Sequence, residues 1–513
     1  MRVSLRAAAG AVLFFCLLMA VPDWAASPQP GAASLNQESR EIFATSMAWG
    51  DRYWDPQAKL CRDPQPDLAD DGRVRPFFMV RESAWYALGL LMRDGPGDRD
   101  RAVEILQVVL EQQYHEPGRP WDGTFRRTPN EPEPGPNAVM WRGYDPNWRE
   151  FIGTTFALIL EEYRDRIPAA MARAMTASID AAVAGEIKQG RLAPTYTNPA
   201  LMLGFLWSYA AGDGGRPEWA GPAAKWVETE YRLFKQHDAF YEFNSPTYAG
   251  VDFYALALWR DYGQTARMRA MGSEMEAALW RTTAQLYNAR LRNISGPYDR
   301  SYGMDMRSYV SVTGLWLRTE LDADEAPLPR FDAGLVDHAD DLWFVPPIVA
   351  LGTRIPADAM RSFEHFGGEH EVRQPIAEGR IATAWIGKDL IYGGEITGHT
   401  RGVDAASQFH PVTVQWQAPG RVGWIQLTRC PPIDADADRK GITITAQGDV
   451  SFRMFAPGIA AAEVTAGEWK LPGLTVRVKA DEKSFSVQQH GDSLYVKYAG
   501  MTEMHLEMAR TGE

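Results

Sequence analysis

The chain has 513 residues, of which 45% are hydrophobic and 23% charged, and its formal net charge at pH 7 is −13. These fractions are ordinary for a globular protein and exclude a disordered or fibrous chain. The acidic balance argues against nucleic acid or an anionic membrane as the main partner. The 18 Trp offer flat apolar faces, and Arg, which far outnumbers Lys, offers a planar fork for carboxylates.

The first 27 residues have the pattern of a secretory signal peptide. Arg2 and Arg6 precede an apolar run over residues 7–21, and the small residues 25–27 then offer a cleavage site. Because the run is too short to span a bilayer comfortably, an uncleaved anchor is the weaker alternative. The sequence therefore predicts an exported protein, secreted or periplasmic, without membrane contact after cleavage.

Helical periodicity extends over residues 37–321. In the segment 82–92, Trp85, Leu88 and Met92 recur at spacings of three and four and share one face. The same pattern recurs at residues 101–113, 151–163, 168–184 and 251–262. Helix pairs separated by long loops rich in Pro, Gly and Trp indicate an α/α toroid, an incomplete helical barrel whose loops build a cleft. We assign this domain to residues 28–327.

After about residue 328 the chain changes to short alternating runs separated by Gly, Asp and Pro, which are typical of an antiparallel β-sandwich. The runs occupy residues 380–386, 412–417, 421–427, 442–447, 474–478 and 493–498. The predicted fold class is thus multidomain α+β, with the toroid first and the β-sandwich over residues 328–513. Cys61 and Cys430 could pair in an oxidising compartment, but two cysteines make no disulfide scaffold.

Four segments combine polar and aromatic residues where neither core packing nor solvation requires both. They are residues 144–153 (YDPNWREFIG), 194–199 (PTYTNP), 240–252 (FYEFNSPTYAGVD) and 293–305 (NISGPYDRSYGMD). Each lies on the approach to a predicted helix, where free N–H groups and the helix dipole favour a bound anion. The alternative is structural: Asn147 and Asn198 could cap helices, and Tyr248 and Tyr298 could be half-buried packing residues.

The polar groups of these segments suit β-elimination next to a uronic acid. That reaction needs a partner for the substrate carboxylate, a base for the C5 proton and an acid for the leaving oxygen. Asn and Arg suit the first task and Tyr or His the other two, and an adjacent Arg is expected to lower the pKa of a Tyr that acts as base. The candidate catalytic residues are Asn198, Asn244, Tyr248, Tyr298 and Arg300.

A second set of side chains is predicted to hold the glycan. Trp121, Trp141 and Trp148 offer stacking surfaces for sugar rings, and Arg residues in the helical loops could make the cleft positive despite the net charge. This balance favours a sparsely charged polymer over a heavily sulfated one. The predicted substrate-binding residues are Asn147, Trp148, Arg149, Trp121, Arg126, Glu242, Asp299 and His410.

Two of these segments resemble polysaccharide lyases of the hyaluronate, chondroitin AC and xanthan type. Residues 147–153 (NWREFIG) are similar to their Asn-Trp-x-x-x-Ile-Gly motif at a helix start, and residues 244–250 (NSPTYAG) to the segment with their catalytic Tyr. Those families join an α/α toroid to antiparallel β-sandwiches, a plan that heparinase II/III-like and alginate lyases share.

The resemblance implies roles for three residues. Tyr248 would transfer the proton, Asn198 would neutralise the carboxylate, and Arg300 would be a supporting cation. One departure concerns the base, because those lyases usually place a His shortly before the catalytic Tyr and this chain has Asn244 in that region.

Three alternatives stay open from the sequence. An inverting glycoside hydrolase on the same toroid needs two facing acids, and the loops offer Asp145, Glu150, Glu242, Asp252, Asp299 and Asp305. A non-catalytic glycan-binding protein needs only the Trp and Arg side chains. A metal site could use His338 with Asp337, Asp340 and Asp341, or His365 with Glu369 and His370, joined by His399 or His410. None of these has recognised zinc-ligand spacing, so no metal or other cofactor is predicted.

Overall fold

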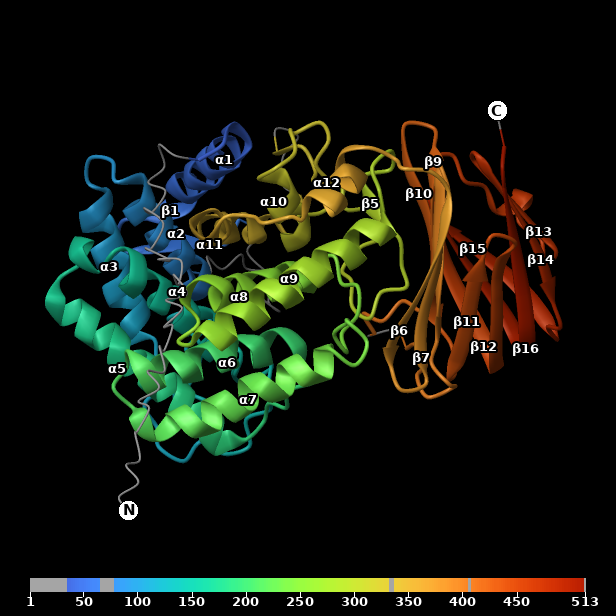
Figure 1. Cartoon of the computed structure of the whole chain (residues 1–513). Coiled ribbons are helices and arrows are strands. Elements are labelled where there is room, and N and C mark those ends of the chain that lie inside the picture. The colour runs from blue at the N-terminus through green and yellow to red at the C-terminus, as the bar shows by residue number, and fades with distance from the viewer. Residues whose placement is uncertain (1–34, 65–77, 332–335, 405–406, 512–513) are drawn as a thin grey trace, which may run out of the picture.

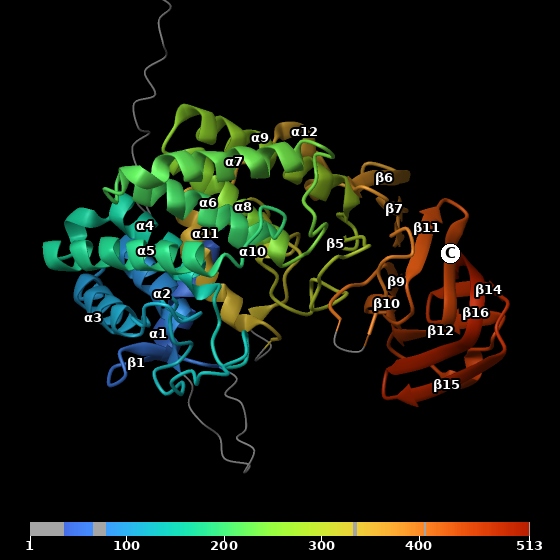
Figure 2. The ribbon, with the colours of Figure 1, turned by 90° about the horizontal axis from the view of Figure 1, so that it is seen from below.

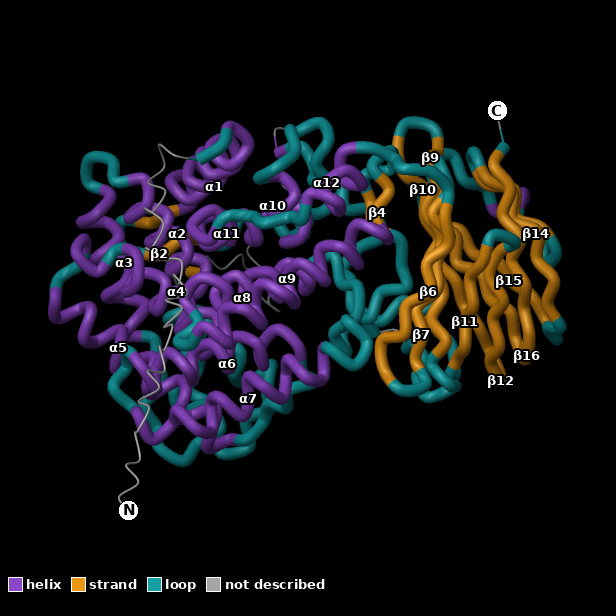
Figure 3. The backbone as a smooth tube through the Cα atoms, in the orientation of Figure 1, coloured by secondary structure: helices purple, strands orange, loops and turns teal. Residues whose placement is uncertain are grey.

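The structure is a computed structural model, and it describes residues 35–64, 78–331, 336–404 and 407–511. The predicted signal peptide lies outside the described residues. Within the described part, no helix is both long and apolar enough to cross a membrane. Helices form the N-terminal half and strands the C-terminal half, and the two halves lie side by side (Figures 1 and 3).

Paired helices build the N-terminal half. The inner helix of each pair is buried on nearly all sides and the outer helix on one face, as a comparison of α8 with α9 shows. The inner helices α2, α4, α6 and α8 pack on each other in chain order, and α11 closes the ring by packing on both α8 and α2 (Figure 2). The helices are α1 (Gln37–Tyr53), α2 (Val80–Arg93), α3 (Asp98–Glu111), α4 (Trp148–Glu162), α5 (Ala169–Gln189), α6 (Thr197–Gly212), α7 (Ala220–Phe234), α8 (Tyr248–Tyr262), α9 (Ala266–Leu286), α10 (Val312–Arg318), α11 (Val345–Leu351) and α12 (Ala357–Glu364).

Gly250 fixes the position of the first turn of α8. A Cβ at this residue would lie 2.4 Å from the backbone nitrogen of Thr313 in α10. The Gly250 carbonyl oxygen also accepts a hydrogen bond from the Trp316 indole at 2.8 Å. Because no larger residue fits there, α10 rests directly on the start of α8 and holds the helix end that carries Tyr248.

The C-terminal half is an antiparallel sheet of eleven strands. The long strand β12 pairs with β11 over its first part and with β10 over its second, and β11 also touches β8, so the sheet closes on a core that contains Trp416, Phe452 and Trp469. Its strands are β6 (His370–Ala377), β7 (Arg380–Ile386), β8 (Leu390–Ile396), β9 (Val412–Ala418), β10 (Arg421–Arg429), β11 (Ile433–Asp438), β12 (Gly441–Phe455), β13 (Glu468–Leu471), β14 (Leu474–Ala480), β15 (Ser484–His490) and β16 (Ser493–Arg510). Short strands in the helical half are β1 (Trp54–Asp55), β2 (Leu60–Arg62), β3 (Phe78–Met79), β4 (Tyr287–Asn288) and β5 (Asn293–Ile294).

The order of a helical toroid followed by an antiparallel β domain confirms the predicted fold class. The predicted boundary at residue 327 is too early, because α11 and α12 follow it and pack on helices α2, α8 and α9. The sheet begins only at His370. Cys61 and Cys430 are both free, and they are buried in the separate cores of the two halves, so they do not pair.

Residues of the first strands also belong to the helical core. Ile376, Ala384 and Ile391 of β6, β7 and β8 are buried in the same cluster as the toroid helices. The Asn288 amide donates to the Gly387 carbonyl oxygen at 2.7 Å across this junction. The sheet edge with β6 and β7 therefore forms one wall beside the loops of the toroid.

Candidate active site

Tyr248 begins α8, where Ser245 turns the chain into the helix. The Ser245 hydroxyl accepts the Tyr248 N–H at 3.1 Å, and the Ser245 carbonyl oxygen accepts the Ala249 N–H at 2.9 Å. Such side-chain bonds satisfy donors that a helix start leaves free. The turn places the half-buried Tyr248 ring at the mouth of the helical ring.

A pocket of about 100 Å³ opens beside Tyr248. The Tyr248 hydroxyl is hydrogen-bonded to that of Tyr302, and the Tyr302 ring stacks on His338 with ring centres 4.1 Å apart at an angle of 18°. Two phenols and an imidazole thus form a row along the pocket. Its lining is Arg81, Trp85, Phe151, Thr247, Tyr248, Val251, Tyr302, Val312, His338, Asp340, Asp341 and Phe344.

Arg300 covers the ring of Tyr248. Its guanidinium carbon lies 3.7 Å from the ring centre, and its Nε donates to Gln408 Oε1 at 2.6 Å. Its Nη1 lies 3.8 Å from Glu242 Oε2. A half-buried guanidinium with one long ion pair can still receive a ligand carboxylate.

The phenols of the pocket are protonated at neutral pH. Burial raises the pKa of Tyr248, Tyr302 raises it further, and Arg300 opposes the rise without reversing it. Burial also raises the pKa of Tyr302 and of Tyr298. Arg300 lowers the pKa of Tyr248 as predicted, but burial outweighs it, so the net lowering expected for a Tyr that acts as base does not occur. Phenols in this state suit proton donation.

Glu242 is the acid next to Arg300. Burial raises its pKa to about 6, while Arg300 lowers it and Asp299 raises it. Asp252, one turn into α8, is buried, and burial together with the Glu242 charge raises its pKa. Glu242 is only partly buried, so of these two acids it is the one that can exchange protons with a ligand.

The rim of the site continues towards α6. Asn198 lies in the first turn of α6 and is buried. Tyr196, just before this helix, has a pKa that burial raises and that Arg300 and Arg191 lower. Arg191 lies 5.9 Å from the Tyr196 ring centre and is paired with Glu186.

Acids and one guanidinium close the opposite side of the pocket. Arg81 lies 5.2 Å from the Trp148 ring centre, and its Nε donates to Glu82 at 2.8 Å. Burial raises the pKa of Asp341, and the charge of Asp340 raises it further. A wall with one guanidinium and several carboxyls has no excess of positive charge, so it does not favour a densely charged polyanion.

Arg149 is not a substrate-binding residue. Its side chain is 1% exposed, and it donates to the carbonyl oxygens of Pro120 and Asp122 and to the Glu186 carboxylate at distances between 2.6 and 3.0 Å. The loop before α4 folds over the helix start, and its carbonyl oxygens together with Glu186 accept hydrogen bonds from all three guanidinium nitrogens. The prediction from sequence is wrong because Pro120 and Asp122, which cover the guanidinium, lie outside the segment 144–153 on which the prediction is based.

The predicted stacking surfaces are also mostly buried. Trp121 packs on Tyr144 and is 3% exposed, and Trp148 lies beneath Arg81. Trp141 alone of the three predicted platforms is open, at 48% exposure. Asn147 precedes α4 without a side-chain capping bond, and Arg126 pairs with Glu133.

Tyr298 and Asn244 hold the loop that joins the two halves. Tyr298 is 1% exposed, and its hydroxyl donates to the Ile294 carbonyl oxygen and accepts from the Gln415 amide at 3.2 Å. The Asn244 amide donates to two carbonyl oxygens of residues 295–297, at 2.7 and 2.8 Å. Both predicted catalytic roles are corrected to structural ones, because these polar groups make their hydrogen bonds inside the protein.

Asp299 and His410 belong to the same junction. Asp299 accepts the Phe243 N–H at 2.7 Å and pairs with Arg380 at 2.7 Å. His410 Nε2 lies 3.3 Å from the Ser301 carbonyl oxygen, and burial lowers the pKa of His410 to about 4. Neither predicted substrate-binding side chain is open to a ligand.

The remaining acids and the histidines form no second centre in the described part of the chain. Burial and the charge of Glu186 raise the pKa of the enclosed Glu150 to about 8. Asp305 accepts hydrogen bonds from Asn293 and the Arg307 backbone. No cluster of three or more metal-ligating side chains occurs among the described residues.

Two family models match the chain. Residues 40–353 match a domain of unknown function, DUF8769, and residues 364–503 match a second one, DUF8770. The chain belongs to the DUF8769 family. No curated sequence matches it.

Three solved structures have a similar arrangement to this DUF8769 protein. Heparinase III is 9% identical, with 93% of this chain and 85% of that chain covered and a TM-score of 0.40. A heparan sulfate lyase HepC mutant from Pedobacter heparinus is 10% identical, with 95% and 84% covered and a TM-score of 0.31. Endoglucanase CelQ from Clostridium thermocellum, complexed with cellobiose and cellotriose, is 10% identical, with 93% of both chains covered and a TM-score of 0.26. Scores below 0.5 support no inference about the site.

The DUF8769 pocket includes three residues that sequence reasoning missed. Tyr302 lies in the segment 293–305, two residues after Arg300, where the sequence predicts Tyr298 as the catalytic phenol. His338 is predicted from the sequence only as a candidate metal ligand, and it reaches the pocket from a left-handed turn with φ 56°. Arg81 starts α2, far from any of the four polar segments.

Proposed function

We propose that this protein is an exported polysaccharide lyase that cleaves a uronic-acid-containing glycan by β-elimination. The observation that carries the proposal is the row of Tyr248, Tyr302 and His338 with Arg300 over the Tyr248 ring. This row combines a proton donor, a proton acceptor and a cation, the three groups that the reaction requires.

The roles follow from the state of each group. Arg300 pairs with the substrate carboxylate and makes the C5 proton acidic, while Asn198, predicted for the same task, is buried and not open to it. His338 accepts that proton, the C4–O bond breaks as the C4–C5 double bond forms, and Tyr248 protonates the leaving oxygen. His338 then releases its proton to water and Tyr248 regains one from water, so no other reactant is consumed, while the Tyr302 hydroxyl holds the Tyr248 hydroxyl in place. The acids around the pocket favour a sparsely charged glycan over a heavily sulfated one.

A panel of uronate polysaccharides with low and high sulfation tests the proposal. We expect the ultraviolet absorbance of a C4–C5 unsaturated product with at least one weakly charged polymer. New reducing ends without that absorbance would contradict the lyase assignment and would support cleavage by hydrolysis.

One observation favours an inverting glycoside hydrolase as the second candidate. The pKa of Glu242 is raised to about 6, which is suitable for a general acid. The partner acid is the weak point of this alternative, because Asp252 and Asp299 are buried and Asp299 is held by Arg380.

A further inference from the structure

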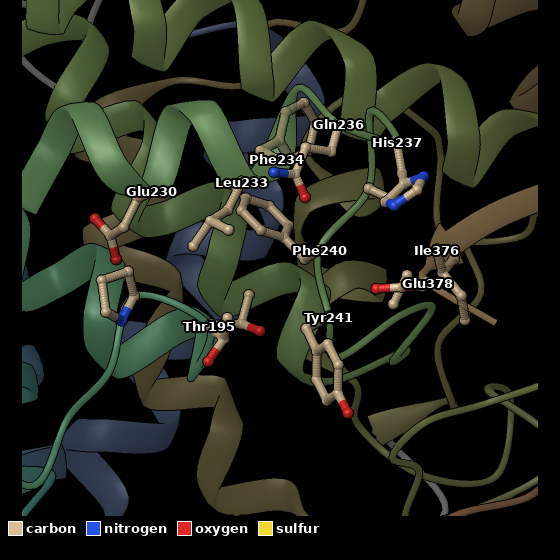
Figure 4. A pocket seen from close by; sticks show the side chains of 14 residues that line it. Thr195, Glu230, Leu233, Phe234, Gln236, His237, Phe240, Tyr241, Ile376 and Glu378 are labelled. Atoms are coloured by element: carbon tan, nitrogen blue, oxygen red, sulfur yellow. The ribbon is translucent and has the colours of Figure 1, made fainter. Parts of the chain in front are cut away.

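A second pocket lies at the junction of the two halves. It has a volume of about 160 Å³ and is formed by the chain before α6, the end of α7 with the loop that follows, and the turn between β6 and β7. Figure 4 shows Glu230 on one side of it, Ile376 and Glu378 on the other, and Tyr241 between them. The pocket is smaller than the roughly 300 to 1,000 Å³ of drug-sized ligand sites, so it suits a single ring.

The walls combine aromatic rings with hydroxyl groups. Phe240 and Tyr241 contribute rings, and Tyr241 is 53% exposed. Thr195 and Thr197 contribute hydroxyls. Apolar CH faces of a sugar can stack on such rings while its hydroxyls bond to the polar groups.

The charges of the lining disfavour an anion. Glu230 and Glu378 are acids, and His237 is the single basic side chain among the described residues that line the pocket. Glu230 is 3% exposed, and burial raises its pKa well above the usual value while the neighbouring Trp226 opposes that rise. Its carboxyl is therefore kept uncharged, which suits an uncharged ligand.

The pocket is connected to the candidate active site by backbone contacts. Tyr241 directly precedes Glu242, whose N–H donates to the Thr197 hydroxyl at 3.4 Å. Thr197 in turn precedes Asn198 at the start of α6. A glycan that extends from Arg300 past this segment therefore brings a neighbouring sugar to the pocket.

We propose that this second pocket binds one uncharged sugar ring of the glycan, next to the uronate that Arg300 receives. The proposal rests on the proposed function and extends it, because it defines the substrate as a polymer in which a uronate is joined to a neutral sugar. The exposed Tyr241 ring supplies the stacking surface. Arg380 lies 4.7 Å from the centre of that ring, but it is paired with Asp299 and Glu395, so the described lining offers no unpaired Lys or Arg to a carboxylate or sulfate group.

Binding of methyl glycosides to the full chain tests the pocket without any need for turnover. Saturation-transfer NMR is measured with uncharged methyl hexosides and methyl N-acetylhexosaminides, and with a methyl glucuronide. We expect weak binding of an uncharged glycoside, about tenfold weaker in Tyr241→Ala and retained in Tyr241→Phe. Tyr495→Ala is the matched control, because Tyr495 is also exposed and also lies beside an Arg, in the distant strand β16.

Loss of uncharged-glycoside binding in Tyr495→Ala as much as in Tyr241→Ala, or no loss in either, would overturn the proposal. Binding of the glucuronide with the same dependence on Tyr241 would overturn it too. With a cleavable polymer, Tyr241→Ala is expected to raise KM about tenfold and to leave kcat within about twofold. Unsaturated product with an unchanged KM would remove the pocket proposal alone, whereas glycoside binding without any unsaturated product would remove the lyase proposal alone.

Discussion

The segments that lead into α4 and α8 look alike in sequence and differ in use. Both combine Asn, Tyr and Glu ahead of a helix, in residues 144–153 and 240–252. At the α4 entrance (residues 144–153), Arg149 is enclosed by carbonyl oxygens of the preceding loop. At the α8 entrance (residues 240–252), Tyr248 stands in an open pocket beside Arg300. Whether a polar helix start becomes a site is therefore decided by the loop that covers it.

Removal of the Tyr248 hydroxyl is expected to have the largest effect. Tyr248→Phe should lower kcat by about 10² to 10⁴-fold, because it removes the proton donor and its bond to Tyr302. The rate of formation of unsaturated product measures the change. Tyr254→Phe is the matched control on the same helix, since Tyr254 is fully buried and outside the pocket. Equal losses in both variants would mean that the phenol at position 248 has only a structural role.

The α4 entrance is expected to respond in stability instead. Arg149→Met leaves Glu186 and several carbonyl oxygens without their donor, so the free energy of unfolding should fall by about 3 to 5 kcal/mol. Denaturant unfolding measures it, with the exposed Arg142→Met as a control that changes stability by less than about 0.5 kcal/mol. Activity per folded molecule should not change. A stable Arg149→Met with a raised KM would place Arg149 among the substrate-binding residues and would remove the contrast between the entrances.

The fold could be predicted because periodicity reports burial directly. The segment 82–92 forms a helix and the segment 412–417 forms a strand because in each the spacing of the apolar residues places them against a core. Tyr248, Arg300 and Glu242 could be proposed as neighbours in function because each lies in a polar loop near a helix start.

The rest of the site depends on contacts between distant parts of the chain. Tyr298 is buried because Gln415 of β9 covers it, and Tyr302, four residues later, is open. His338 reaches the pocket only because the short helix after it packs on α2. No local pattern separates Tyr298 from Tyr302 or marks His338 as a partner of either.

His410 offers a pH test of the junction that buries the mispredicted residues. Its pKa is about 4 in the folded protein and near 6.5 in an unfolded chain. Between these values the unfolded chain binds a proton that the folded protein does not. The contribution of His410 to the free energy of unfolding is therefore fully present above pH 6.5 and falls by about 3 kcal/mol as the pH decreases to 4. Chemical denaturation across this range measures the loss.

The variant His410→Asn should remove this share of the pH dependence, even if it lowers stability at neutral pH. His490→Gln is the control, because His490 is exposed in β15 and should leave the curve unchanged. If both variants keep the full pH dependence of the free energy of unfolding between pH 6.5 and 4, His410 is not buried as described, and it is again a candidate substrate-binding residue.

Glu242 should give the smallest effect and the sharpest choice between chemistries. Its carboxyl ionises near pH 6, and the ionised form helps to hold Arg300 over the Tyr248 ring. A pair as exposed as this is worth up to about 1 kcal/mol, so kcat/KM of a lyase should rise by no more than about fivefold as the pH increases through 6. Glu242→Gln should flatten that rise and keep most of the activity. In a hydrolase that uses Glu242 as its acid, kcat/KM instead falls above pH 6, and Glu242→Gln abolishes activity. That result would identify the Glu242 carboxyl, and not the phenols, as the catalytic group of the α8 entrance.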